Sequence, residues 1–252
     1  MKEKISISVD KDMLEKIDSF IDNQDIRNRS QAFEYLIRKT LKKDVKKAVI
    51  LAGGEKEKLR YGKTFKPLVK VNGKEVILHT IDVLRRYKIN ELIVCAGSLN
   101  DEIARMINDN GLKISYIKDN NIGTAGVLKQ AKKYLNKEDF FVVSGDIWFD
   151  FGLDKMMAFH NTHNEPVTIS ISTTKLQESK DRLELEGNKI VRFDYAPRIK
   201  TFTVNAGVYI LRPDILDMLP ARGSLEKDVF PKLARAGKIV AYNFSGSWRH
   251  IS

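Results

Sequence analysis

Cysteine is almost absent from this sequence of 252 residues, because Cys95 is the only one. A lone cysteine excludes an internal disulfide, and its apolar neighbours predict a thiol buried in a core. Long hydrophobic runs are absent as well, since none approaches the ~20 residues that cross a bilayer. The first residues alternate charge with β-forming residues and do not resemble a signal peptide. We therefore expect a cytoplasmic protein that makes no membrane contact.

Acidic residues are fewer than basic ones, 33 against 44, and the net charge is +11 at pH 7. Hydrophobic residues make up 42% and charged residues 31%, which is the composition of a soluble globular protein. Most of the positive excess lies beyond residue 43. A nucleic acid would explain this charge, and so would phosphorylated small molecules. Charge alone therefore leaves both classes of partner open.

The first 43 residues predict a strand followed by two helices. Lys4 to Val9 alternates polar and apolar residues, as a half-buried strand does. Asp10 is a favourable N-cap for a first helix. The segment from Asn23 to Asn28 interrupts the helical pattern, and we expect Ser30 to cap a second helix. The apolar positions at helical spacing are Met13, Leu14, Ile17, Phe20 and Ile21, and then Ala32, Phe33, Leu36, Ile37 and Leu41.

The predicted strand has no partner strand within this segment, and about 40 residues are too few for an adequate core. Two copies that pair their strands across a two-fold axis would solve both problems. With this reasoning, the run Ile5-Ser6-Ile7-Ser8-Val9-Asp10 and the later Arg29-Ser30-Gln31-Ala32 resemble the ribbon-helix-helix DNA-binding family. The resemblance implies a homodimer, or a higher even oligomer, that binds double-stranded DNA.

In that family the paired strands enter the major groove and read base edges. Carried over to this sequence, the resemblance assigns base reading to Lys4, Ser6 and Ser8. It assigns phosphate contacts to Arg29 and Ser30, at the amino end of the second helix. The alternative is that residues 1–43 serve only to hold two copies together.

Residues 44–252 predict a second domain, of the α/β class. Continuous apolar runs, typical of buried parallel strands, occur at 48–52, 92–96 and 140–144. Helical stretches at 76–87, 101–108 and 125–135 alternate with them, so we expect a parallel sheet covered on both faces. Four later segments, at 167–173, 183–185, 189–193 and 206–211, predict further strands and a mixed sheet with antiparallel parts.

Functional groups in such a sheet gather beyond the carboxyl ends of the strands. Asp146 follows the third apolar run, where an aspartate is as often an N-cap as a metal ligand. The order of the motifs adds context: Leu51-Ala52-Gly53-Gly54, Lys66-Pro67-Leu68, Gly123-Thr124-Ala125-Gly126, Ser144-Gly145-Asp146, Asn205-Ala206-Gly207-Val208-Tyr209 and Glu226-Lys227-Asp228-Val229-Phe230-Pro231. Together they resemble the sugar-phosphate nucleotidyltransferases, the nucleoside-diphosphate-sugar pyrophosphorylases, from about Lys47 to Ser252. The fold that this implies is a Rossmann-like domain with a mixed, mainly parallel sheet.

The resemblance also implies a chemistry and its residues. A sugar-1-phosphate oxygen attacks the α-phosphorus of a nucleoside triphosphate, and pyrophosphate leaves, with catalysis by positioning, positive charge and Mg²⁺. Asp146 would hold the metal, and Lys66 would neutralise the sugar phosphate. The nucleotide would lie on Leu51, Ala52, Gly53 and Gly54, with Gly123 and Thr124 near the base or ribose. Asn205 and Glu226 would hold sugar hydroxyls, with Lys227 close by.

Three departures from the family pattern fall on the functional positions. The glycine-rich loop usually continues Gly-Gly-x-Gly-Thr-Arg, but this chain reads Gly53-Gly54-Glu55-Lys56-Glu57-Lys58. Lys58 or Arg60 would replace the arginine, although a lysine loses the bidentate fork. Tyr195 and Ala196 stand where a sugar-side acid and lysine are common. His250 occupies the position of a second metal carboxylate, and imidazole suits Mg²⁺ less well than Mn²⁺.

The sequence therefore leaves two functions open. The first is an active nucleotidyltransferase that carries a DNA-binding head. The second is a transcriptional regulator whose second domain senses a nucleotide or nucleotide sugar without turning it over. Losses at the loop, the sugar side and the metal position, within a preserved fold, are compatible with both.

Overall fold

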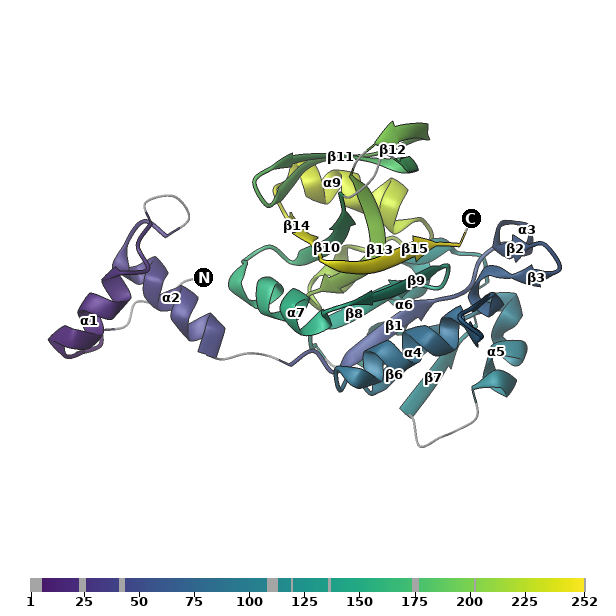
Figure 1. The fold of residues 1–252 in the computed structure, drawn as a ribbon, viewed down its shortest axis with the longest axis horizontal. Helices are drawn as coiled ribbons and strands as arrows, with labels where there is room; N and C mark the ends of the chain where they lie inside the picture. Colours follow the sequence, from purple (N-terminus) through teal and green to yellow (C-terminus); the bar gives the residue numbers. More distant parts are fainter. Residues whose placement is uncertain are drawn as a thin grey trace. The chain divides into compact units, whose positions relative to one another are not determined.

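The computed structural model describes residues 6–22, 26–40, 44–107, 113–118, 120–135, 137–173, 177–201 and 203–251 (Figure 1). The chain divides into two compact units, Met1–Lys43 and Asp44–Ser252. We call the first unit the head and the second the body. None of the helices that these described residues form is long and apolar enough to cross a membrane.

The two helices expected in the head are present, and their caps follow from local side chains. Helix α1 (Lys11–Asp18) begins after Asp10, whose carboxylate accepts a hydrogen bond from the backbone N–H of Met13 at 2.8 Å. This cap was predicted and is confirmed. The predicted apolar pattern extends to Ile21, but the helix ends at Asp18. The backbone N–H of Ser19, the C-cap, donates to the Glu15 carbonyl.

The cap of the second helix differs from the prediction. Helix α2 spans Arg29–Thr40, and the side-chain oxygen of Asn28 accepts a hydrogen bond from the backbone N–H of Gln31 at 3.0 Å. The Gln31 side chain reaches back and accepts from the Arg27 N–H at 2.7 Å. This exchange satisfies two orphan donors in the manner of a capping box. Ser30 was the wrong residue for the cap, because it already lies inside the first turn.

The predicted strand of the head is not seen as a strand. Lys4 and Ile5 lie outside the described residues, and Ser6 to Asp10 form no ladder with any described residue of the same chain. The ring of Phe20, two residues after α1, lies near the ring of Tyr35 in α2, with 6.0 Å between the ring centroids. A strand–helix–helix order is thus only partly visible, and the ribbon-helix-helix arrangement stays a prediction.

The body is built on a nine-stranded sheet with the order β11-β12-β14-β10-β13-β8-β1-β6-β7. Its parallel part consists of β1 (Lys47–Leu51), β6 (Glu91–Cys95), β7 (Lys113–Ile117) and β8 (Phe140–Ser144). The three apolar runs of the sequence form β1, β6 and β8 to within one residue. Cys95 is buried at the end of β6, as its neighbours indicated.

The other part of the sheet is mixed, which confirms the expectation from the later segments. It contains β10 (Val167–Ser172), β11 (Gln177–Glu186), β12 (Lys189–Thr201), β13 (Val204–Leu211) and β14 (Ile239–Asn243). Strand β13 runs antiparallel to both β8 and β10 and so joins the two parts, whereas β14 runs parallel to β10. The sequence did not predict β7 or β14.

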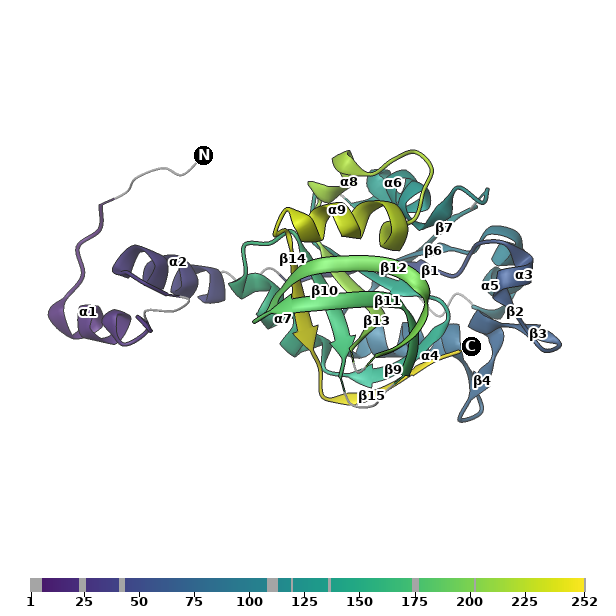
Figure 2. The same cartoon turned by 90° about the horizontal axis from the view of Figure 1, so that it is seen from above.

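Helices cover both faces of the sheet, as the alternation of strands and helices predicted. One core layer packs under α6 (Gly123–Leu135), α8 (Ile215–Met218) and α9 (Phe230–Arg235). The opposite layer packs under α4 (Val76–Arg86), α5 (Asn100–Met106) and α7 (Leu153–Thr162). Within β1, Val49 belongs to the first layer, and Ala48 and Ile50 belong to the second. Figure 2 shows α6, α8 and α9 on the side of the sheet away from α4 and α7.

Several short elements lie at the carboxyl end of the parallel strands. Strand β9 (Ile147–Phe151) pairs antiparallel with β15 (Gly246–His250), which brings the end of the chain beside the end of β8. The remaining elements are α3 (Lys56–Leu59), β2 (Arg60–Tyr61), β3 (Thr64–Phe65), η1 (Lys66–Leu68), β4 (Lys70–Val71), β5 (Lys74–Glu75), η2 (Gly97–Leu99) and η3 (Leu225–Val229). These short elements carry the predicted site residues Lys58, Lys66, Glu226, Lys227 and His250.

Candidate active site

The ends of β1 and β8 lie in close contact, and a glycine permits this. The backbone N–H of Gly145 donates to the Leu51 carbonyl at 2.9 Å. A Cβ at Gly145 would come within 2.7 Å of the Cα of Ala52, a distance that real side chains do not adopt. The glycine therefore lets the Asp146 turn approach the loop that begins at Ala52.

Asp146, Lys66 and His250 come together at this point, although they are far apart in the sequence. The His250 Nε2 lies 3.2 Å from Asp146 Oδ2, and the Lys66 Nζ lies 3.6 Å from the same oxygen. The Asp146 side chain is 29% exposed, so it remains accessible. Burial raises the pKa of Asp146, but the hydrogen bond and charge of His250, together with the charge of Lys66, outweigh burial and hold the pKa below its usual value. The carboxylate is thus ionised at neutral pH.

The β9–β15 ribbon holds His250 in place. His250 pairs with Ile147, the residue after Asp146, and the backbone N–H of Ile251 donates to the Asp146 carbonyl at 2.8 Å. Trp248 anchors the same strand, because its indole N–H donates to the Ala206 carbonyl of β13 at 2.7 Å. The sequence motifs identified His250, but they predicted neither strand of this ribbon.

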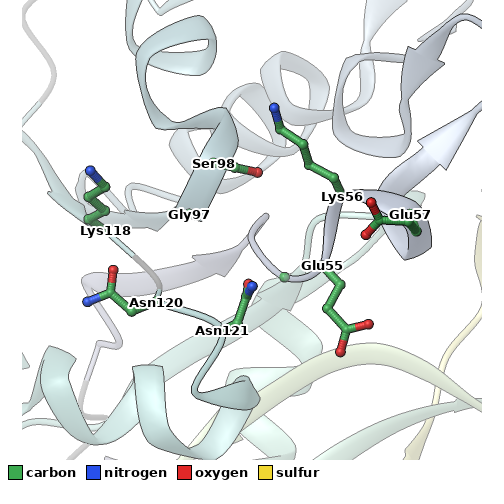
Figure 3. Close-up of a pocket in the computed structure, with 9 residues that line it drawn as sticks. Glu55, Lys56, Glu57, Gly97, Ser98, Lys118, Asn120 and Asn121 are labelled. Carbon is green, nitrogen blue, oxygen red and sulfur yellow. The ribbon is translucent and has the colours of Figure 1, made fainter.

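A cavity of about 510 Å³ opens between the loop after β1 and the ends of β6 and β7. It is lined by Gly54, Glu55, Lys56, Glu57, Gly97, Ser98, Lys118, Asn120 and Asn121 (Figure 3). Among the predicted nucleotide residues, Gly54 alone belongs to this lining. Sequence reasoning missed the residues from 97 to 121. For Gly97 and Ser98 the available signal was their position directly after the apolar run of β6, whereas Lys118, Asn120 and Asn121 follow β7, a strand that the sequence did not predict.

The loop that departs from the family pattern forms the short helix α3. Lys58 pairs with Glu55 at 2.7 Å, its side chain is 74% exposed, and it does not line the cavity. Lys56 lines the cavity instead, and Figure 3 shows its side chain beside that of Ser98. Lys56, and not the predicted Lys58, therefore lies in the lining of the cavity.

The predicted sugar-side residues form one hydrogen-bonded group across β13, η3 and α6. The Asn205 side chain donates to the Tyr209 hydroxyl at 2.9 Å, and that hydroxyl lies 3.5 Å from Glu226 Oε1. The other oxygen of Glu226 accepts from the hydroxyls of Ser224 at 2.7 Å and Thr124 at 3.2 Å. The Thr124 hydroxyl thus points to Glu226, whereas the resemblance assigned this residue a place near the base or ribose.

Lys227 lies next to this group and contacts one of the departing positions. Its ammonium lies 4.7 Å from the ring centroid of Tyr195 on β12, within the range of a cation–π interaction. Tyr195 is 39% exposed. The Tyr195 ring, at one of the departing positions, therefore contacts the predicted sugar-side residue Lys227.

The described residues at this point supply two of the ligands that a divalent cation needs. Asp146 offers one carboxylate and His250 one imidazole, and the described residues contain no group of three His, Cys, Asp or Glu side chains suited to a metal. Mg²⁺ commonly binds to one or two carboxylates and takes its other ligands from water and substrate phosphates. This donor set fits a cation that is shared with a substrate and does not fit an all-protein site.

Known proteins resemble the body over almost its whole length. A family model described as Nucleotidyl transferase matches residues 47–251. The catalytic subunit beta of mannose-1-phosphate guanylyltransferase from Xenopus tropicalis is 32% identical over 220 residues, which is 81% of this chain and 61% of the relative. The corresponding subunit from Dictyostelium discoideum is 34% identical over 220 residues, with 81% of this chain and 60% of the relative covered. This chain thus spans about three fifths of the length of these relatives.

Solved structures agree with the fold. HddC from Yersinia pseudotuberculosis, crystallised with GMP-PN, is 25% identical, with a TM-score of 0.66, 82% of this chain and 94% of that chain covered. An inositol-1-phosphate CTP transferase from T. maritima is 18% identical, with a TM-score of 0.68, 84% of this chain and 91% of that chain covered. The family model matches residues 47–251, and the relatives named above are 32% and 34% identical. The chain therefore belongs to the nucleotidyl transferase family.

Proposed function

We propose that the body joins a nucleoside triphosphate to a sugar-1-phosphate, with release of pyrophosphate. The observation that carries this proposal is the convergence of His250 and Lys66 on the Asp146 carboxylate, at 3.2 and 3.6 Å. In the reaction a phosphate oxygen of the sugar-1-phosphate forms a bond to the α-phosphorus. The bond from the α-phosphorus to the bridging oxygen breaks, and that oxygen leaves on pyrophosphate. Because the nucleophile is already ionised, positioning and charge are sufficient.

The roles of the charged residues follow from their positions. Lys66 would neutralise the sugar phosphate, and its ammonium is held near the site by Asp146. Asp146 would bind Mg²⁺ or Mn²⁺ with His250 as the second protein ligand. When bound, the cation would offset the negative charge of the triphosphate. Because His250 brings nitrogen and no negative charge, we propose that Mn²⁺ supports the reaction better than Mg²⁺.

The two substrates would approach from different sides of Asp146. The nucleotide would enter the cavity beside Gly54, where Asn120 and Asn121 offer amide donors and acceptors. The sugar would meet Asn205, Glu226 and Lys227. The relatives include guanylyltransferases named for mannose-1-phosphate, so GTP and mannose 1-phosphate are the first pair to test.

A second candidate function is sensing without turnover, and one observation favours it. His250 contacts Asp146 where the sequence pattern of the family has an acid, so the site has lost a negative charge that a metal would use. A pyrophosphate-release assay across nucleoside triphosphates and sugar-1-phosphates, with Mg²⁺ and then with Mn²⁺, separates the two. Turnover with any pair establishes the transferase, whereas nucleotide binding without pyrophosphate release establishes the sensor.

For the head we propose pairing with a second copy and binding to double-stranded DNA. In the described part of the head, Ile17 and Ala32 are the buried apolar residues, while four large apolar side chains are at least one third exposed: Ile7, Met13, Phe20 and Ile37. A unit of this size needs additional apolar burial, which a second head would supply.

The structure bears on the proposed DNA contacts at the serines of the first segment and at Arg29. Ser6 and Ser8 are exposed and available for base reading. The Arg29 guanidinium makes two hydrogen bonds to the Asp18 carboxylate, at 2.7 and 2.8 Å, and would have to leave Asp18 to contact a phosphate. A site-selection experiment with a duplex library tests the proposal. Absence of any preferred sequence would leave the head as a dimerisation unit.

A further inference from the structure

Two segments that are far apart in the sequence, residues 122–126 and 221–225, pack closely against each other. The backbone N–H of Gly223 donates to the Ile122 carbonyl at 2.8 Å, and the N–H of Ala125 donates to the Gly223 carbonyl at 3.0 Å. A Cβ at Gly123 would lie 2.3 Å from the Gly223 carbonyl oxygen, and one at Gly126 would lie 2.6 Å from that of Ala221. The start of α6 and the segment before η3 therefore pack as closely as backbones can.

Thr124 sits at the centre of this junction, and its hydroxyl makes two hydrogen bonds there. It accepts a hydrogen bond from the backbone N–H of Leu225 at 2.8 Å. It donates its single proton to Glu226 Oε2 at 3.2 Å. A hydroxyl has one proton to donate. While this bond holds, Thr124 has no donor left for a base or a ribose.

Glu226 receives its orientation from hydroxyl groups on three different elements. Thr124 comes from α6, Ser224 caps η3, and Tyr209 comes from β13. Element η3 is a π-helical turn, a rare conformation that often occurs at functional sites. The carboxylate is thus held in one position, as a group that recognises sugar hydroxyls requires.

We propose that Thr124 is a positioning residue for the sugar phosphate, acting through Glu226 and not through the nucleotide. This inference rests on the proposed nucleotidyl transfer and names a residue that determines its second substrate. Asn120 and Asn121 line the nucleotide cavity a few residues before Thr124 in the chain. The junction therefore joins the wall of the nucleotide cavity to the sugar-side carboxylate in one rigid piece.

The test compares three variants of the full chain with the native protein. Thr124→Val removes the hydroxyl and keeps the shape, Thr124→Ser restores the hydroxyl, and Thr168→Val is the matched control. Thr168 is buried and hydrogen-bonded through its hydroxyl to His160, so the same change is made outside the site. Steady-state kinetics give kcat and both KM values with GTP and mannose 1-phosphate, and thermal unfolding gives the Tm of each variant.

Thr124→Val is expected to raise KM for mannose 1-phosphate about tenfold, which corresponds to the loss of one hydrogen bond to a charged group. KM for GTP stays within about twofold of the native value, and Thr124→Ser and Thr168→Val keep both native KM values. A rise in KM for GTP alone, or equal rises in both, overturns the inference, and so does an unchanged KM for mannose 1-phosphate. A native chain that neither turns over nor binds any sugar-1-phosphate overturns the proposed function, and the inference with it.

Discussion

The buried imidazole of His160 makes the stability of the body depend on pH. Its side chain is 1% exposed, its Nδ1 lies 2.7 Å from the Thr168 hydroxyl, and its Nε2 has no hydrogen-bond partner among the described residues. Burial, together with the charges of Arg212 and His163, lowers the pKa of His160 from 6.5 to about 3. The imidazole is therefore neutral in the folded protein over the whole range in which an unfolded chain would protonate it.

The sign of the effect follows from proton binding. Below pH 6.5 the unfolded chain takes up a proton at His160 that the folded chain does not bind, until the pH reaches about 3. The free energy of unfolding then falls by about 1.4 kcal/mol for each unit of pH. Between about pH 6.5 and pH 4.5 the body loses roughly 2–3 kcal/mol from this one residue. Above pH 6.5 the contribution vanishes.

Equilibrium unfolding in urea measures this directly. The two tryptophans of the chain, Trp148 and Trp248, both belong to the body, so their fluorescence reports its unfolding. The double variant His160→Leu/Thr168→Val removes the imidazole and its partner hydroxyl together, and it should lose roughly 2–3 kcal/mol less than the native chain on acidification. Thr168→Val alone keeps the imidazole and should keep the native pH dependence. Equal pH dependence in the native chain and the double variant would refute the reasoning.

Three further predictions concern other parts of the chain. The buried Thr80 hydroxyl has no partner among the described residues, so Thr80→Val should raise the free energy of unfolding by about 1 kcal/mol in the same urea assay; a loss of stability would contradict this. His250→Asp restores a second carboxylate beside Asp146 and should increase kcat with Mg²⁺ at least about tenfold while reducing the advantage of Mn²⁺; an unchanged metal preference would show that His250 does not bind the cation. Ile7→Pro removes a backbone donor from the head segment and should convert the chain from dimer to monomer in sedimentation velocity; a native chain that is already monomeric at micromolar concentration would exclude pairing through the head.

Much of the body could be predicted because its signals are local. Apolar runs of about five residues became β1, β6 and β8, since a strand buried on both faces needs no alternation of polar residues. The ordered motifs also identified Asp146, Lys66 and His250, which the structure brings within 3.2 to 3.6 Å. Asp146 directly follows β8 and Lys66 directly follows β3, whereas His250 is held by the pairing of β15 with β9.

What the sequence did not predict depends on contacts between distant segments. Strand β9 alternates buried and exposed residues over only five positions and is stabilised by β15, nearly one hundred residues later. The cavity gathers residues from three separate strand ends, and of these residues only Gly54 belongs to one of the ordered motifs. In the head, Asn28 and Ser30 are both residue types that cap helices well. Asn28 is the cap because it accepts from the Gln31 N–H while the Gln31 side chain accepts from the Arg27 N–H. The Thr124 hydroxyl turns to Glu226 for a similar reason, because the junction supplies its partners.

The most direct test of the central claim compares two aspartates of the body, Asp146 just before β9 and Asp150 within β9. Asp146 lies at the site, whereas Asp150, four residues later, is exposed and pairs with Arg86 at 2.8 Å. Formation of a nucleotide sugar from GTP and labelled mannose 1-phosphate, with Mn²⁺ present, is measured by chromatography for the native chain, Asp146→Asn and Asp150→Asn. The account predicts product from the native chain and from Asp150→Asn, and a loss of at least about a hundredfold in Asp146→Asn. Equal product from Asp146→Asn and the native chain would contradict it.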